Sequence, residues 1–169
     1  MSNALLLLCL FTTFGLEITK IPSTDTPPRE LVNSAIAYDE SQNRMIVFGG
    51  FDPQLNEYLY NTYSFSLESL TWAEIIPESE FVPSGIAFTR TAIYNNILYV
   101  FYGRRAEGIS ANVYSFNLFT YVWKIEYIEG DNVSGRFNYA FTTFEYNNAV
   151  YAAIFGGFTN LGIDNSLFL

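Results

Sequence analysis

The feature that most constrains the fold is an internal repeat with a period of 51 residues. Tyr63 and Trp72 are nine residues apart, and so are Tyr114 and Trp123, which follow them by 51 positions. Two aromatic positions that recur in register indicate one supersecondary unit repeated along the chain. Because such units bury their apolar faces against their neighbours, the chain is predicted to be a row of similar units.

Each repeat is predicted to contain four short strands. The first strand is apolar, and its copies are 35–38, 91–94 and 141–144. The second strand ends in glycine, and its copies are 45–50, 98–103 and 153–157. Turns that contain asparagine, which tolerates left-handed backbone, join these two strands at 39–44, 95–96 and 147–148. The tyrosine and the tryptophan of each repeat mark the third and fourth strands.

The second and third repeats depart from the pattern. The third carries two additional residues before its glycines, which we interpret as a β-bulge. Its tyrosine is replaced by Leu167, in its third strand. The second repeat has Tyr102-Gly103 in place of two glycines, and it has Ile86 where the others have arginine. These departures are typical of drift in a structural repeat.

The composition limits the chemistry that the chain can perform. Half of the residues are apolar and 15% are charged, against about 25% charged in an average soluble domain, which favours strands buried on both faces. The net charge of -9 argues against binding to nucleic acid or to an anionic membrane. The chain has no histidine, and Cys9 is its single cysteine. We therefore predict no metal site, no cofactor and no catalytic residue.

The glycine pair, the tyrosine and the tryptophan, recurring in register over residues 16–169, resemble the kelch repeat. The residues that carry the resemblance are Arg29, Gly49, Gly50, Tyr63, Trp72, Gly103, Tyr114, Trp123, Arg136, Gly156 and Gly157. The resemblance implies an all-β fold of four-stranded antiparallel propeller blades, with these residues in structural roles. About three blades are expected, whereas closed propellers have roughly 4 to 8. We therefore expect an incomplete or open propeller unless missing C-terminal blades or self-association complete it.

The first fifteen residues have two interpretations. The apolar run 4–14 has the length of a signal-peptide core and is too short to span a membrane, so residues 1–15 are predicted to be a signal peptide. In the alternative, residues 4–15 are strands of an earlier blade. The remaining segments are a fourth strand with its loop at 16–29, blades at 30–76 and 83–128, and a blade without its fourth strand at 134–169. The sequon at Asn132 is a candidate glycosylation site and favours a secreted or lumenal protein over a cytoplasmic one.

Strand alternation places the loops between second and third strands on the same edge as the connections between blades. The loops are 51–59, 104–111 and 158–164, and the connections are 22–30, 77–85 and 129–135. Recognition concentrates in such loops, and the kelch resemblance implies a protein partner. We predict a non-catalytic protein-interaction scaffold whose acidic edge binds a basic protein of unknown identity. The candidate partner-binding residues are Asp52, Glu57, Glu78, Glu80, Arg104, Arg105, Glu107, Asp131 and Asp164.

Two alternative functions are open at this point. The aromatic residues Tyr58, Tyr60 and Phe158 would suit an extracellular glycan-binding propeller. A fragment of a kelch-like propeller enzyme, such as a galactose-oxidase-type copper oxidase, would need histidine ligands, which the chain lacks.

Overall fold

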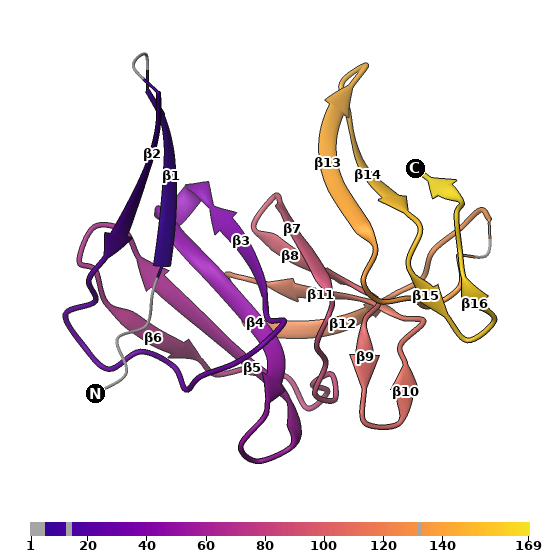
Figure 1. Cartoon of the computed structure of the whole chain (residues 1–169), viewed down its shortest axis with the longest axis horizontal. Helices are drawn as coiled ribbons and strands as arrows, with labels where there is room; N and C mark the ends of the chain where they lie inside the picture. The colour runs from indigo at the N-terminus through magenta and orange to yellow at the C-terminus, as the bar shows by residue number, and fades with distance from the viewer. Residues whose placement is uncertain (1–5, 13–14, 132) are drawn as a thin grey trace.

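The computed structural model describes residues 6–12, 15–131 and 133–169, and it describes side chains from residue 18 onward. This part of the chain is all β apart from one short 3₁₀ turn, η1 (Glu40–Gln42). Its strands form three larger antiparallel sheets that stand side by side in chain order (Figure 1). Within the described residues, no strand pairing closes the row into a ring. The predicted all-β, incomplete propeller is therefore confirmed, and the sheets are its blades.

Blades one and two have four strands each, and blade three has three. Blade one consists of β3 (Ala35–Asp39), β4 (Arg44–Asp52), β5 (Glu57–Ser66) and β6 (Trp72–Ile75). Blade two consists of β7 (Arg90–Tyr94), β8 (Ile97–Phe101), β11 (Val113–Asn117) and β12 (Val122–Glu126). Blade three consists of β13 (Ala140–Tyr146), β14 (Ala149–Phe155) and β17 (Leu167–Phe168). Successive strands of each blade are neighbours in its sheet, so each blade is a meander.

The tight turns predicted from the asparagine pairs are confirmed. Asn95 and Asn96, between β7 and β8, have φ angles of 49° and 60°. Asn147 and Asn148, between β13 and β14, have φ angles of 51° and 61°. Two successive positive φ angles are typical of a type I′ turn, which joins the strands of a two-residue hairpin because its twist matches theirs.

Two predictions for blade three are wrong. The two additional residues lengthen the β13–β14 hairpin and form no bulge, because these strands pair without a register shift. The tyrosine position is also different from the predicted one. Phe168 lies opposite Ile154 in the sheet, as Tyr114 lies opposite Val100 in blade two. Phe168, and not Leu167, therefore occupies the tyrosine position, since the longer hairpin shifts the residue count.

Ahead of blade one, β1 (Leu6–Thr12) and β2 (Gly15–Ile21) form a separate antiparallel hairpin (Figure 1). A hairpin of a third and a fourth strand is what the earlier-blade interpretation expects of these residues. Residues 1–5 and 13–14 lie outside the described residues. The signal peptide at 1–15 therefore stays a prediction.

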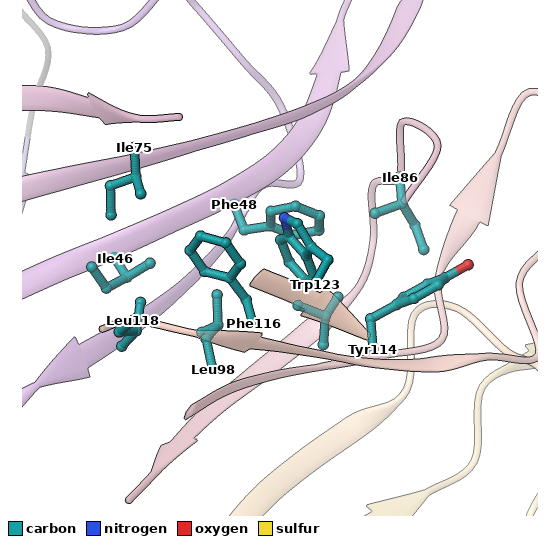
Figure 2. Packing of buried hydrophobic residues seen from close by; sticks show 10 residues of the cluster. Ile46, Phe48, Ile75, Ile86, Leu98, Tyr114, Phe116, Leu118 and Trp123 are labelled. Atoms are coloured by element: carbon teal, nitrogen blue, oxygen red, sulfur yellow. The ribbon is translucent and has the colours of Figure 1, made fainter. Parts of the chain in front are cut away.

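The largest core lies between blades one and two. Figure 2 shows Phe48 of β4 beside Trp123 of β12, and their ring centroids are 5.0 Å apart. Trp123 also stacks on Phe116, with 4.6 Å between centroids. Blades two and three meet in a similar way, because the Phe101 ring lies 5.0 Å from that of Phe141. Each blade thus buries its apolar side chains against the next blade.

A backbone hydrogen bond joins each of the first two blades to the next. The Gly50 N–H donates to the Ile86 carbonyl at 2.8 Å, and the Gly103 N–H donates to the Arg136 carbonyl at 2.9 Å. Gly50 and Gly103 have φ angles of 113° and 117°, in a region that favours glycine. A Cβ on Gly49, also at positive φ, would collide with the carbonyl oxygen of Ile86 in blade two. Glycine is therefore required where one blade approaches the next.

The entry to each blade has a common register. Ala87, directly after Ile86, pairs with Arg104, and the residue directly after Arg136 pairs with Phe158. Both partners directly follow the second-strand glycine of the same blade. In blade one Val32 makes this pairing. Leu31 is therefore the structural counterpart of Ile86 and Arg136. Arg29, which the sequence pattern assigns to this position, lies two residues earlier.

Replacing Phe48 with alanine is expected to destabilise the fold by about 3–5 kcal/mol, the usual cost of truncating a buried phenylalanine. Phe48 has no exposed surface, and its ring packs on the next blade. Phe119, which is 76% exposed in the β11–β12 turn, is a matched control. Phe119→Ala should change stability by less than about 0.5 kcal/mol. Urea unfolding followed by tryptophan fluorescence measures both, and equal losses would contradict the assigned core.

Candidate functional site

The predicted long loops fold as three hairpin arms. In blade one, β4 and β5 continue as a pair out to Asp52 and Glu57. Blade two carries β9 (Arg104–Arg105) paired with β10 (Gly108–Ile109), and blade three carries β15 (Phe158–Thr159) paired with β16 (Gly162–Ile163). Figure 1 shows the β4–β5 loop and the β9–β10 arm projecting from the side opposite to the β13–β14 turn. We call the side that bears the three arms the arm edge.

Each arm is fastened at its base to the segment that enters the same blade. The pairs are Val32 with Phe51, Ala87 with Arg104, and Phe137 with Phe158. Each pair exchanges two backbone hydrogen bonds, with lengths between 2.8 and 3.1 Å. The first strand of each arm is therefore paired on both sides, with the entry segment and with the second strand of the arm. Such support suits recognition from a rigid scaffold.

Four side chains form a continuous patch across the bases of the second and third arms. The rings of Phe137 and Phe158 stack with 5.4 Å between centroids, and Phe88 meets Phe137 edge-on at 5.8 Å. The Arg104 guanidinium lies 5.5 Å from the Phe137 centroid, within cation–π range. Arg104 is exposed, and Phe158 is 44% exposed. We call these four residues the Arg104 patch, which offers a cation beside an apolar surface.

The sequence patterns point to only part of this patch. They select Arg104 as a loop residue and Phe158 as an exposed aromatic, but they do not select Phe88 or Phe137. The signal for these two was their place in the chain. Both follow closely after the Ser-Gly dipeptide that opens a blade entry, and Phe137 lies opposite the residue that follows the glycine pair.

Asp52 is part of the base of the first arm and is 5% exposed. Its Oδ2 accepts a hydrogen bond from Arg29 Nη1 at 3.2 Å. Its Oδ1 accepts the backbone N–H groups of Gln54 and Leu55 at 2.8 and 3.1 Å. The backbone hydrogen bond from Leu55 is the largest effect on the pKa of Asp52 and lowers it. With the hydrogen bonds from Gln54 and Arg29, it outweighs burial, which would raise this pKa. Its carboxylate thus caps the arm and has little surface for a partner.

Asp164 holds the third arm in a similar way. It accepts the Ser166 N–H at 2.6 Å, and its Oδ2 lies 3.2 Å from Arg136 Nη2. The Ser166 hydrogen bonds, followed by the Arg136 charge, lower the pKa of Asp164. Arg136 has no exposed surface, donates to the Gly156 carbonyl at 2.8 Å and lies 4.8 Å from the Phe168 ring. This ion pair therefore fastens blade three internally.

Blade two forms the same joint without charge. The Ser110 N–H donates to the Gly103 carbonyl at 2.8 Å, and the Asp164 N–H donates to the Gly157 carbonyl at 2.9 Å. Ser110 is therefore the counterpart of Asp164. Ile86, the counterpart of Arg136, is fully buried. A hydroxyl and an apolar side chain thus replace the ion pair.

The exposed charges on the arms are few. Glu57 is exposed at the start of β5, and Glu107 is exposed between β9 and β10. Arg105 lies 4.0 Å from Glu107, and its Nη1 donates to Ser84 Oγ at 3.3 Å. Asp131 is exposed on the connection between blades two and three. Glu57 and Glu107 are therefore the predicted carboxylates that the arms present to solvent.

The remaining candidates lie elsewhere. Glu78 and Glu80 are exposed, but the Glu78 N–H donates to the Tyr121 carbonyl at 2.8 Å. The structure thus places Glu78 against the β11–β12 turn and not on an arm. Asn132, the candidate glycosylation site, lies outside the described residues. Among the residues with described side chains, no group of three or more His, Cys, Asp or Glu is arranged to hold a metal ion.

The aromatic residues considered for glycan binding belong to two different blades. Tyr58 packs on Phe51 in blade one, with 5.0 Å between ring centroids. Tyr60 is also in blade one and is 51% exposed. Phe158 belongs to the Arg104 patch in blade three. The three residues therefore do not form one stacking platform.

A hollow of about 170 Å³ lies at the turns of blades one and two, where the sequence patterns predict no site. Its lining includes Asp39, Arg44, Asn96, Leu118 and Tyr121. Arg44 Nε donates to Asp39 Oδ2 at 2.9 Å, and Asp39 is 1% exposed. This buried ion pair closes the turn at 39–44. The opposite charges at the two ends of that turn were the sequence signal for it.

Placing the blade-two arrangement in blade three tests the ion pair. Asp164→Ser alone leaves the buried Arg136 without its carboxylate. It is expected to destabilise the chain more than Arg136→Ile combined with Asp164→Ser, which removes both charges. Urea unfolding midpoints at about pH 7 measure the difference. A double variant that is less stable than Asp164→Ser would contradict the assignment.

The lowered pKa of Asp164, which the Ser166 hydrogen bonds and then the Arg136 charge cause, predicts a pH dependence. Because the folded pKa of Asp164 is below its unfolded value, the stabilisation is present above the unfolded pKa. It is lost as the pH falls through the folded pKa. The wild-type midpoint should therefore fall more steeply than that of the double variant below about pH 4. Parallel curves for the two proteins would show that the Asp164 carboxylate contributes nothing to stability.

Comparison with known families identifies the repeats. The family model of the KLHDC2/KLHL20/DRC7 Kelch-repeats domain matches residues 2–169. No curated protein matches the chain. In the part of the chain that the structure describes, no helix has the length and apolar character needed to cross a bilayer. Kelch-repeat domains mediate protein–protein interaction and are typically non-catalytic scaffolds. The repeats, the blades and the family match agree, and the chain belongs to the kelch-repeat family.

Proposed function

We propose that the chain is a non-catalytic scaffold that binds a protein partner on its arm edge, with the Arg104 patch at the centre of the contact. The observation that carries this proposal is the exposure of Arg104 and Phe158 above a base that is hydrogen-bonded on both sides. Arginine and large aromatic side chains supply much of the binding energy in protein interfaces. Because the stacked rings already hold Arg104, little order is lost on binding.

The charge of the chain sets the character of this partner. The net charge of -9 favours a partner with a basic surface through long-range attraction. Glu57 and Glu107 are exposed on the first and second arms, on the same edge of the molecule as the Arg104 patch. Asp52 and Asp164 contribute less, because ion pairs already neutralise them. We therefore expect an apolar contact at the patch with basic residues of the partner beside the arms.

Truncation of the patch is the first test of this function. Arg104→Ala and Phe158→Ala should each weaken partner binding by about thirtyfold, the loss expected when a 2 kcal/mol hot spot is removed. Partners captured with the wild-type chain from extracts of the source organism would be titrated against each variant. Tyr127→Ala is the matched control, because Tyr127 is 90% exposed outside the arms. An equal loss with Tyr127→Ala, or no loss with either patch variant, would refute the patch as the centre.

Reversal of the arm charges is the second test. Glu57→Lys combined with Glu107→Lys should slow association with a basic partner and flatten its dependence on salt. Glu68→Lys combined with Glu145→Lys, two exposed residues outside the arms, changes the net charge by the same amount and is the control. Association rates at low and high ionic strength measure the effect. Identical salt dependence in the wild type and the double variant would count against an electrostatic role of the arms.

A further inference from the structure

We propose that the outer edge of β6, in blade one, binds an extended basic segment of a partner protein, which adds to the sheet as one more strand. The segment places one apolar side chain in a hollow beside this edge. The edge and the hollow both lie within residues 60–82, between blades one and two, so the contact depends on neither end of the chain. It is separate from the contact proposed for the Arg104 patch.

The backbone of β6 is open on its outer side. β6 pairs with β5 alone and is the last strand of its sheet (Figure 1). The Trp72 N–H points away from β5, because it donates to the Asp25 carboxylate at 2.9 Å. Backbone groups alternate in direction along a paired strand, and β6 pairs without a register shift, so those of Glu74 also point outward. The next outward residue, Ile76, makes no backbone hydrogen bond within the described residues. The end of this edge is therefore free to pair with another strand.

A hollow of about 260 Å³ adjoins the free end of this edge. Its lining consists of Tyr60, Asn61, Thr62, Glu74, Ile75, Ile76, Pro77 and Val82. Tyr60 is 51% exposed and Ile76 is 64% exposed, so apolar surface is left uncovered here. Thr62, the least exposed residue of the lining at 1%, has a buried Oγ1 with no hydrogen-bond partner within the described residues. Apolar walls with one polar atom left to satisfy are typical of a pocket that selects its occupant.

An added strand would bring a side chain to this hollow. Thr62 and Ile75 are a cross-strand pair, so their side chains lie on one face of blade one, the face that packs on blade two. Every second side chain of a segment paired with the outer edge lies on that same face. A methionine side chain fits there, because it is apolar and unbranched and its sulfur is a weak acceptor for the Thr62 hydroxyl. Backbone hydrogen bonds supply the affinity of such a contact, and the hollow supplies its specificity.

The charges on this rim favour a basic segment. Residues 45–89 contain no lysine or arginine. Glu74, Glu78 and Glu80 are exposed on β6 and on the connection that follows it. A segment with a lysine on each side of its methionine would therefore meet carboxylates, and no cation of residues 45–89 would repel it.

A synthetic peptide tests the contact without knowledge of the partner. The peptide has the sequence Lys-Thr-Met-Thr-Lys and is acetylated and amidated at its ends. Added to the nitrogen-15-labelled chain of 169 residues, it should shift the NMR signals of the Glu74 and Ile76 amides, with a dissociation constant of about 1 mM. It should also slow the exchange of these two amides with solvent. A peptide with glycine in place of methionine, and one with glutamate in place of both lysines, should each bind at least about tenfold more weakly.

A backbone variant separates strand addition from binding in the hollow alone. Ile76→Pro removes an N–H that has no partner in the fold, so it should cost little stability but raise the dissociation constant of the peptide about tenfold. Ile76→Val keeps the N–H, and Ile128→Pro places proline at an exposed residue of the connection after blade two. Both controls should bind like the wild type. The amide spectrum without peptide shows whether each variant is folded, and the altered peptides test the same contact in the wild type if Ile76→Pro is not.

Several outcomes would overturn the proposal. These are the absence of shifts, shifts confined to the Arg104 patch, equal binding of the three peptides, and wild-type affinity in a folded Ile76→Pro variant. Glu74 and Ile76 amides that are protected before peptide is added would show that another copy of the chain occupies the edge, and would overturn it as well. Arg104→Ala should leave peptide binding unchanged, so this proposal and the one for the Arg104 patch fail separately.

Discussion

The structure depends on the hydrogen bond that a glycine at the end of strand two donates to the next blade. Gly50 reaches Ile86 and Gly103 reaches Arg136 across the gap between two sheets. This bond sets how closely the blades approach, and the approach lets Phe48 meet Trp123. A blade has no comparable core within itself, because its apolar side chains face its neighbours. The glycine joint therefore turns separate meanders into one cooperative structure.

Much of this arrangement was predictable because local chemistry decides it. The spacing of Tyr63 and Trp72 marks two paired strands, and the Asn95-Asn96 pair specifies a hairpin with little dependence on the rest of the chain. Residue counting failed where hairpins differ in length. Leu167 was displaced from the tyrosine position by the longer β13–β14 hairpin, and Leu31 took the place assigned to Arg29. The repeat period alone does not show which pair of strands is lengthened by additional residues, so positions after the insertion are assigned to the wrong residue.

The candidate site was less predictable because its residues meet across long stretches of chain. Asp164 resembles an exposed loop carboxylate in the sequence, but Arg136, 28 residues earlier, pairs with it. The Arg104 patch joins side chains from two blades, and no local pattern links Arg104 to Phe137. In blade two, Ile86 and Ser110 replace Arg136 and Asp164, so the same joint forms there without an ion pair. The chemistry at this position is therefore set by pairing with its own arm and not by the repeat.

The length of the β13–β14 hairpin has a consequence for how such a blade can change. Side chains alternate between the two faces of a strand, so inserting one residue into β14 would turn Ile154 outward and Phe155 inward. An insertion of two residues keeps the parity of the strand, and Ile154 stays in the core beside Tyr139. Growth of a blade by even steps at its turn therefore leaves the packing layers untouched. The third blade is longer than the second by such a step in each of its first two strands, seven residues against five.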